Sequence, residues 1–261
     1  MGQFSMKIIP STGSRLDGNQ QSLVVATTQG DPLIEAQKAK GLVDIGAEGL
    51  IVSGMIHAPE FHDLIWQSRL PAVAISCFDP AYELPTIGYD NAGAARTALQ
   101  HLVDLGHRQI AVLHGAVYNN DRTQARVDAL RNQQGELGMS FHEVALSTAG
   151  GCDGVAALMS GPGHETALLC LSDVLATGAI FELQRRGISV PDQISVMGID
   201  DLPGSAYLYP QLTTVHLPVS RMGQAAADAI AGWVETQDVP RHCLLEFELV
   251  IRASTAPPAP T

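Results

Sequence analysis

Short apolar runs alternate with longer amphipathic stretches along most of the chain. Six of these runs are almost continuously apolar, as strands that are covered on both faces of a sheet should be. We therefore predict strands at residues 23–27, 49–52, 72–75, 109–113, 167–171 and 194–197. Because strands and helices follow one another through short links, the pattern predicts an α/β fold built on parallel sheets.

Helical patterns lie between the predicted strands, and two of them carry clear end signals. Asp31 and Pro32 begin one helix as N-cap and first residue, and Gly46 ends it. Asn91 caps the next helix, which ends before Gly106. Three further helices are expected at residues 121–137, 173–186 and 219–236.

The end of the chain departs from this alternation. Residues 243–251 alternate apolar and polar side chains, which predicts one edge strand with a solvated face. The proline-rich residues 256–261 are expected to be a disordered tail.

Two local features elsewhere are also interpreted from the sequence. Residues 150–154 are interpreted as a glycine-rich turn before a helix, and His107 as a cation that caps the end of the preceding helix.

Composition narrows the possible functions. The chain has 261 residues, 46% hydrophobic, and a formal net charge of −12. A free-standing nucleic-acid binder usually has a basic face, which this acidic chain lacks. The four cysteines are far apart, without a CxxC pair, and no histidine spacing suggests a metal site. We find no signal peptide and no apolar run of about 20 residues, so we expect a cytoplasmic protein without metal or cofactor.

Eight short motifs occur in the order and spacing of a single family. With them the chain resembles, from about residue 22 to residue 255, the effector-binding region of the lactose-repressor/galactose-repressor (LacI/GalR) family of bacterial transcription regulators. One motif alone would be weak, but eight in register are specific. The motifs are GYDNAG (88–93), HLVDLGHR (101–108), DR with a later Arg126 (121–126), LSD (171–173), RGISVPD (186–192), ISVMGIDD (194–201), PQLTTV (210–215) and ELVIR with ST (248–255).

The resemblance implies a periplasmic-binding-protein-like fold of class I. In such a fold two α/β lobes with parallel sheets are joined by three crossovers, and a small ligand sits in the cleft between them. The expected N-terminal lobe comprises residues 1–105 and 219–245, and the C-terminal lobe residues 106–218 and 246–255. The resemblance also implies a homodimer that responds to a small-molecule effector, with a sugar or polyol as the expected class.

The start of the chain departs from the family pattern. The family carries a helix-turn-helix that we do not find in this sequence, so DNA contact is expected only through such a module. The expected first lobe is truncated, because the family has a strand and a helix before the strand at residues 23–27. Residues 1–21 fit either a helical face that Pro10 and Gly13 interrupt, or a remnant of the first strand at residues 6–9.

Polar side chains follow the predicted strands, at the edge where open parallel sheets bind ligands. Asp90 follows a short extended run, where it can accept hydrogen bonds from ligand hydroxyls, and Asn91 can contact ligand or serve only as an N-cap. Ser172 and Asp173 follow another strand. There they can cap a helix and complement its dipole, and Ser172 can also hydrogen-bond a ligand at the mouth of the cleft.

Three more positions complete the expected binding site. The resemblance places Arg126 in the cleft, where its planar fork of five donors suits paired hydroxyls or a carboxylate, although a lone helical arginine is usually solvated; Arg122 is a weaker candidate. Asp200 is favoured as ligand-facing and Asp201 as structural, because free carboxylate oxygens can accept from sugar hydroxyls. The predicted ligand-binding residues are Asp90, Asn91, Arg126, Ser172, Asp173, Asp200 and His216.

Three functions fit these observations to different degrees. The favoured one is the ligand-sensing, non-catalytic domain of a transcription regulator. The alternative is a periplasmic solute-binding protein of a transporter, which would share the fold. A third is a glycosidase that uses Asp200 or Asp201 with Asp90. No nucleophile elbow or phosphate-binding loop is present, so no catalytic residue is predicted.

Overall fold

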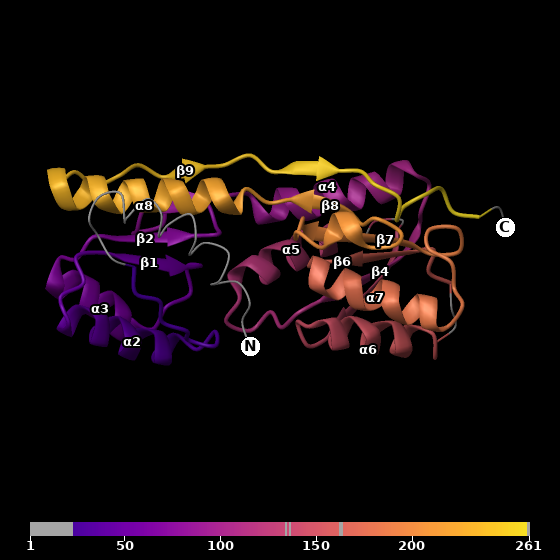
Figure 1. The fold of residues 1–261 in the computed structure, drawn as a ribbon, viewed down its shortest axis with the longest axis horizontal. Coiled ribbons are helices and arrows are strands. Elements are labelled where there is room, and N and C mark those ends of the chain that lie inside the picture. Colours follow the sequence, from indigo (N-terminus) through magenta and orange to yellow (C-terminus); the bar gives the residue numbers. More distant parts are fainter. Residues whose placement is uncertain (1–22, 134, 136, 162–163, 260–261) are drawn as a thin grey trace. The chain divides into compact units, whose positions relative to one another are not determined.

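The computed structural model describes residues 23–133, 135, 137–161 and 164–259 (Figure 1). The hypotheses about residues 1–21 therefore lie outside the described residues. The chain divides into two compact units: unit 1 is Met1–Asp90, Asn119–Arg122 and Pro218–Glu246, and unit 2 is Asn91–Tyr118, Thr123–Leu217 and Phe247–Thr261. Within the described residues, no helix is long and apolar enough to cross a membrane.

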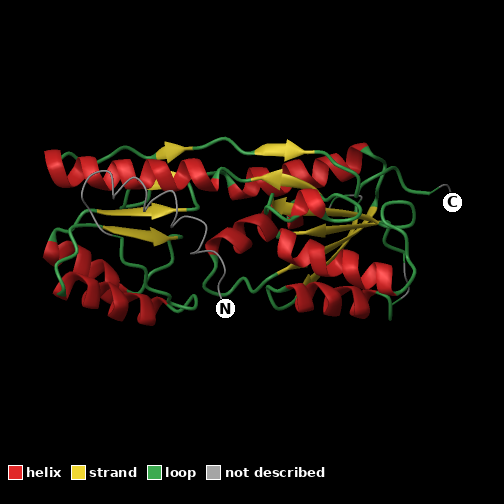
Figure 2. Cartoon of the chain, in the orientation of Figure 1, coloured by secondary structure: helices red, strands yellow, loops and turns green. Residues whose placement is uncertain are grey.

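Unit 1 is built on a four-stranded parallel sheet with the strand order β1-β2-β3-β9. Helices α2 and α3 pack together on one face of this sheet, and α8 covers the other (Figure 2). Phe61 of α3 is completely buried in this core. The bounds are α2 Pro32–Asp44, β1 Leu50–Ser53, α3 Pro59–Ser68, β2 Ala72–Ile75, β3 Thr86–Gly88, α8 Val219–Thr236 and β9 Cys243–Leu244.

Unit 2 is built on a six-stranded sheet with the order β10-β8-β7-β6-β4-β5, in which only β10 runs antiparallel to its neighbour. Helices α6 and α7 lie side by side on one face (Figure 1). The bounds are α4 Asn91–Asp104, β4 Gln109–His114, α5 Asp121–Arg131, β5 Gly138–Glu143, α6 Thr148–Leu158, β6 Ala167–Cys170, α7 Asp173–Arg185, β7 Ser195–Asp200, η2 Ser205–Tyr207, β8 Thr213–His216 and β10 Glu248–Val250.

The chain passes between the units after Asp90, after Leu217 and after Glu246, and Asn119–Arg122 returns briefly to unit 1. The first of these passages lies earlier than the boundary at residue 105 expected from the sequence. Helix α4 accounts for the difference, because it packs against β6, β7 and β8 of unit 2. Its apolar face, which includes Leu99 and Leu102, is fully buried there.

The central elements agree with the sequence pattern. Strand β2 and helix α8 have the predicted bounds, and β1, β4, β6 and β7 lie within one to three residues of theirs. Asp31 is the N-cap of α2, since its Oδ1 accepts from Leu33 N at 2.8 Å and Ile34 N at 3.3 Å. The α/β fold with parallel sheets is thus confirmed.

Four local predictions of secondary structure were wrong. Residues 23–27 form no strand: the described residues provide no neighbouring strand for them, and Val24 and Val25 are exposed. Residues 243–251 form two short strands, β9 and β10, which belong to different sheets. Helix α5 ends at Arg131 because the following residues lead into β5. The glycine-rich residues 150–154 belong to α6, which Ser147 caps.

The glycines of α6 allow close contact with α7. A Cβ on Gly151 would lie 2.2 Å from Leu175 O, and one on Gly178 would lie 2.0 Å from Thr148 O. Both distances are too short for a real Cβ contact with rigid backbone, so these positions need glycine. The predicted turn was therefore wrong for a packing reason: glycine here serves helix-helix approach.

The proline-rich tail was expected to be disordered, yet its first residues are held in place. His107, which is 1% exposed, has Nε2 at 2.9 Å from Ala256 O and Nδ1 at 2.8 Å from Thr166 Oγ1. Ser195 Oγ also donates to Ala256 O at 3.0 Å. His107 is therefore not the helix cap that the sequence suggested: its ring joins the tail to the sheet, and Thr255 similarly meets His101 at 3.0 Å.

Burial makes this attachment sensitive to pH. Desolvation lowers the pKa of His107 below its usual range, although the Ala256 carbonyl acts in the opposite direction. A histidine whose pKa is lower in the folded state contributes stability above its unfolded pKa, near 6.5, and loses it as pH falls through the folded pKa. We expect urea unfolding to show lower stability at pH 5.5 than at pH 7.5.

The variant His107→Gln separates this histidine from the other titrating groups. It should show a smaller loss of stability between pH 7.5 and pH 5.5 than the unchanged chain, and an overall destabilisation of about 1–2 kcal/mol at pH 7.5. The matched control His142→Gln removes a half-buried histidine from β5. An unchanged pH dependence in His107→Gln would contradict the assignment.

Candidate functional site

The strands of unit 2 place several polar side chains at one edge of its sheet. Strands β4, β6, β7 and β8 are parallel, so their carboxyl ends meet at the same edge. His114 ends β4, Ser172 follows β6, Asp200 ends β7 and His216 ends β8. This is the edge at which an open parallel sheet binds ligands.

Ser172 and Asp200 are joined directly. Ser172 Oγ donates to Asp200 Oδ2 at 2.8 Å, and the two residues are 1% and 4% exposed. Ser172 is also the N-cap of α7, because its Oγ accepts from Val174 N at 3.3 Å. The capping and the ligand-facing interpretations of Ser172 are therefore compatible in one geometry.

The backbone at the end of β7 is strained. Asp200 has φ of 130° and the next residue, Asp201, has φ of 55°. Residues other than glycine seldom adopt these conformations, and such positions gather at binding and catalytic sites when the surrounding structure holds them in place. The strain turns the chain sharply and leaves the Asp200 carboxylate at the sheet edge.

Arg126 of α5 reaches the same edge and is 5% exposed. Its Nε donates to Asn91 Oδ1 at 3.0 Å and its Nη1 to Leu171 O at 2.9 Å. These bonds use two of the five guanidinium N–H groups. Arg126 forms no ion pair within the described part of the chain. A buried cation whose neighbours supply only neutral acceptors marks a place where further acceptors are needed.

Asp173 has a different surrounding from the other predicted site residues. It is completely buried, and its oxygens accept from three protein donors: Leu202 N at 2.9 Å, Ser205 Oγ at 2.5 Å and Thr214 Oγ1 at 2.6 Å. Desolvation raises the pKa of Asp173, and these hydrogen bonds oppose the rise. Gly198 makes room, because a Cβ there would lie 2.2 Å from Asp173 Oδ1.

These bonds give Asp173 a positioning role. The donors Leu202 and Ser205 belong to the turn that follows Asp200 directly, so the Asp173 carboxylate holds that turn against the start of α7. The strained residue Asp200 is the last residue of β7 and lies just before this turn. Its backbone is therefore fixed by β7 on one side and by the turn on the other, and its side chain accepts from Ser172.

His216 pairs with the neighbour of Asp200. Its Nδ1 lies 3.1 Å from Asp201 Oδ2, while Arg252 Nη2 donates to Asp201 Oδ1 at 2.7 Å. The His216 side chain is 48% exposed, and His216 is the strand partner of Asp200. The carboxylate of Asp201 is thus bound by His216 and Arg252, which agrees with the structural role expected for Asp201.

Unit 1 carries its own polar groups after β1 and β3. Asp90 follows β3 and is exposed. Asp121 Oδ2 accepts from Met55 N at 2.5 Å, just beyond β1, and Asp121 Oδ1 lies 3.0 Å from Arg122 Nη1. The weaker candidate Arg122 is therefore ion-paired within unit 1.

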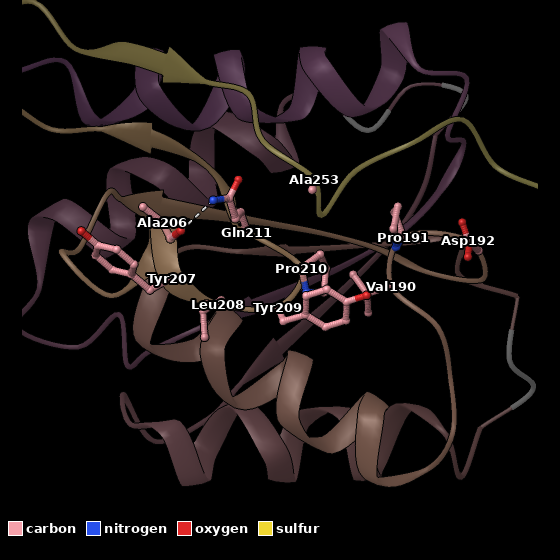
Figure 3. Close-up of a pocket in the computed structure, with 10 residues that line it drawn as sticks. All are labelled: Val190, Pro191, Asp192, Ala206, Tyr207, Leu208, Tyr209, Pro210, Gln211 and Ala253. Atoms are coloured by element: carbon pink, nitrogen blue, oxygen red, sulfur yellow. Dashed lines mark hydrogen bonds between the residues drawn. The ribbon is translucent and has the colours of Figure 1, made fainter.

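A surface pocket of about 700 Å³ lies elsewhere in unit 2 (Figure 3). It opens where the chain enters β7 and β8, opposite the edge just described, and Tyr207 and Tyr209 beside it are almost fully exposed. None of the predicted site residues lines it. The lining residues are Val190, Pro191, Asp192, Ala206, Tyr207, Leu208, Tyr209, Pro210, Gln211 and Ala253.

Sequence reasoning did not include two features of this edge. His114 was not considered, although it directly follows an apolar run, and a polar residue after such a run is the signal that pointed to Asp200. The donors Ser205 and Thr214 were missed because their role depends on which carboxylate folds back toward them. No pattern in the sequence indicates that contact.

Comparison with known proteins places this geometry in a class. The family described as the periplasmic binding protein-like domain matches residues 99–255, more than half of the chain. The HTH-type transcriptional regulator MalR of Streptomyces coelicolor is 33% identical over 94% of this chain and 74% of its own length. The chain is thus a periplasmic-binding-protein-like domain of the type found in transcription regulators.

Solved structures narrow the class further. A LacI family transcriptional regulator from Bifidobacterium animalis subsp. lactis matches with a TM-score of 0.86 and 25% identity, over 99% of this chain and 96% of its own. A LacI family regulator from Enterococcus faecium, solved with bound ribose, has the same fold with a TM-score of 0.86 and 20% identity, over 97% and 94% of the two chains. This chain belongs to the LacI family of transcription regulators.

The positioning role of Asp173 can be tested by stability. Asp173→Ala should lower the free energy of unfolding by about 3 kcal/mol, because it leaves three donors without their acceptor, two of them on the buried residues Ser205 and Thr214. Asp192→Ala, in an exposed loop, is the matched control and should change stability by less than about 0.5 kcal/mol. Urea unfolding at pH 7 measures both, and equal effects of the two substitutions would rule the role out.

Proposed function

We propose that this chain is the ligand-sensing domain of its regulator and that its ligand is a sugar or a related polyol. The buried guanidinium of Arg126, which has no carboxylate partner in the described residues, carries this proposal. Two of its donors bind protein oxygens, and three remain to donate to ligand. The ribose held by a regulator of the same fold supports the ligand class.

A polyol matches both charges at this edge. Arg126 can only donate hydrogen bonds and ionised Asp200 can only accept them, whereas a hydroxyl does both. The two side chains flank the same short segment, since Arg126 binds the carbonyl of Leu171 and Asp200 accepts from the hydroxyl of Ser172. Neighbouring hydroxyls of one sugar can therefore satisfy them together. Asn91 then serves to orient Arg126, and Asp173 to position the turn after Asp200.

Binding rather than catalysis is the role we propose. A glycosidase needs two carboxyl groups placed across the scissile bond, one of them able to deliver a proton. Of the carboxylates in this part of unit 2, Asp173 is filled by protein donors, and Asp201 is bound by Arg252 and His216. These protein contacts of Asp173 and Asp201 support a non-catalytic site, and we assign the contact with ligand to Asp200.

The regulatory step we propose is a shift between two arrangements of this domain. A ligand that binds one arrangement more tightly than the other favours that arrangement. A preference of about 1.4 kcal/mol for one arrangement changes the equilibrium tenfold. The wider proposal includes a cytoplasmic homodimer that contacts DNA through a helix-turn-helix module; the relative MalR is named an HTH-type transcriptional regulator.

Isothermal titration calorimetry tests the proposal. The unchanged chain is titrated with D-ribose, D-glucose, D-galactose and maltose, and at least one should bind with a Kd below 1 mM, on the order expected for small ligands. Arg126→Lys should raise the Kd for that sugar by about 30-fold, because lysine lacks the planar fork of donors. Asp200→Asn should raise the same Kd by about tenfold.

A control on the same helix makes the result specific. Arg131 of α5 lies over the ring of Phe141, 5.2 Å from its centre, and forms part of the surface of the helix. Arg131→Lys should bind the sugar within twofold of the unchanged chain. Absence of binding to every sugar by a folded sample, or equal affinities of Arg126→Lys and Arg131→Lys, would refute the proposed site.

A further inference from the structure

His114 lies at the ligand edge of unit 2, and the proposed function leaves it unused. Its main chain is fixed on both sides: Leu171 N donates to Leu113 O at 2.9 Å, and Val144 N donates to His114 O at 2.9 Å. His114 therefore stands between the segment that follows β6 and the segment that follows β5. The residue is 3% exposed.

Ring contacts place the His114 side chain on the face of the sheet that carries α5. Its ring centre lies 6.5 Å from that of Phe141 on β5. Arg131 of α5 lies over the same phenylalanine ring, with its Cζ 5.2 Å from the centre. Arg126 belongs to the same helix and donates to Leu171 O. The N–H group of Leu171 in turn donates to the carbonyl of Leu113, the residue before His114. The imidazole of His114 and the guanidinium of Arg126 thus lie on the same face of the sheet and at the same edge.

The tautomer of His114 follows from its own hydrogen bond. Nδ1 lies 2.8 Å from the carbonyl oxygen of Gly115, which can only accept, so Nδ1 carries the proton. In the neutral ring Nε2 is then an acceptor. The bond to Gly115 is the one hydrogen bond of this side chain within the part of the chain that the structure describes. This nitrogen is not fully buried, so a ligand hydroxyl can reach it and donate to it.

We propose that His114 is a specificity-determining residue of the ligand site, whose Nε2 accepts a hydrogen bond from a sugar hydroxyl. The inference rests on the proposed function and adds an acceptor on the side where Arg126 supplies only donors. A ligand with a hydroxyl near both groups can accept from the guanidinium and donate to the imidazole. The site therefore selects a hydroxyl over a hydrogen or an ether oxygen at that position.

The tautomer gives a first test that needs no ligand. Long-range ¹H–¹⁵N correlation spectra of the full chain at pH 7.5 should show His114 with a protonated Nδ1 and an unprotonated Nε2. The assignment uses the His114→Gln spectrum, from which these signals are missing. A proton on Nε2 would overturn the inference, because that nitrogen could not then accept from a hydroxyl.

Binding gives the second test, with the same four sugars, D-ribose, D-glucose, D-galactose and maltose. For a sugar that binds the unchanged chain, His114→Phe should raise Kd about tenfold, because the ring volume stays and the acceptor is lost. His114→Gln should recover to within about threefold, since its amide oxygen can accept. His142→Phe, on the neighbouring strand β5, is the control and should leave Kd unchanged. Circular dichroism and melting temperature verify that each variant is folded.

The outcomes separate this inference from the proposed function. A sugar that binds the unchanged chain and His114→Phe equally, while Arg126→Lys is weakened, overturns the role of His114 alone. If none of the four sugars binds the unchanged chain, the proposed function fails and the role of His114 fails with it. Loss of affinity in His114→Phe with recovery in His114→Gln supports both.

Discussion

A guanidinium that leaves water must replace its hydration with protein or ligand acceptors, and this requirement governs the ligand edge of unit 2. Arg126 obtains two such acceptors, the side-chain oxygen of Asn91 and the carbonyl of Leu171. Both are neutral, so its charge is left without a carboxylate in the described residues. The cost of that arrangement is understandable if a ligand completes it. Asn91 belongs to helix α4 and Leu171 directly follows β6, so both elements help to position this one side chain.

The acidic residue at this edge, Asp200, is positioned in a different way. Asp200 sits on strained backbone, and the turn beyond it is tied down by the buried carboxylate of Asp173. Strain at a binding residue persists only when its surroundings determine it, and three donors on one carboxylate do so here. The small residue Gly198 in β7 provides the space for that carboxylate. The hydrogen bonds that stabilise this turn are thus made by Asp173, beside the strained residue Asp200.

Periodicity predicted the parallel sheets because buried parallel strands leave a nearly continuous apolar run, and β2 and β6 are of this kind. It failed at residues 23–27, where an apolar run lacks a neighbouring strand in the described residues, and at residues 150–154, where glycine serves helix packing. The sequence placed polar residues at the carboxyl ends of the strands, where the structure has them. It could not distinguish Asp173, which turns toward protein donors, from Asp200, because side-chain direction depends on contacts between distant segments.

The central claim is that a hydroxylated ligand bridges Arg126 and Asp200, and a crystal structure of this chain with a bound sugar tests it most directly. Crystals grown with whichever of D-ribose, D-glucose, D-galactose and maltose raises the melting temperature most would supply the density. We predict a sugar with hydroxyl oxygens within about 3.2 Å of the Arg126 guanidinium and the Asp200 carboxylate. A sugar bound instead in the pocket beside Tyr207 and Tyr209, with the Arg126 edge empty, would contradict the account.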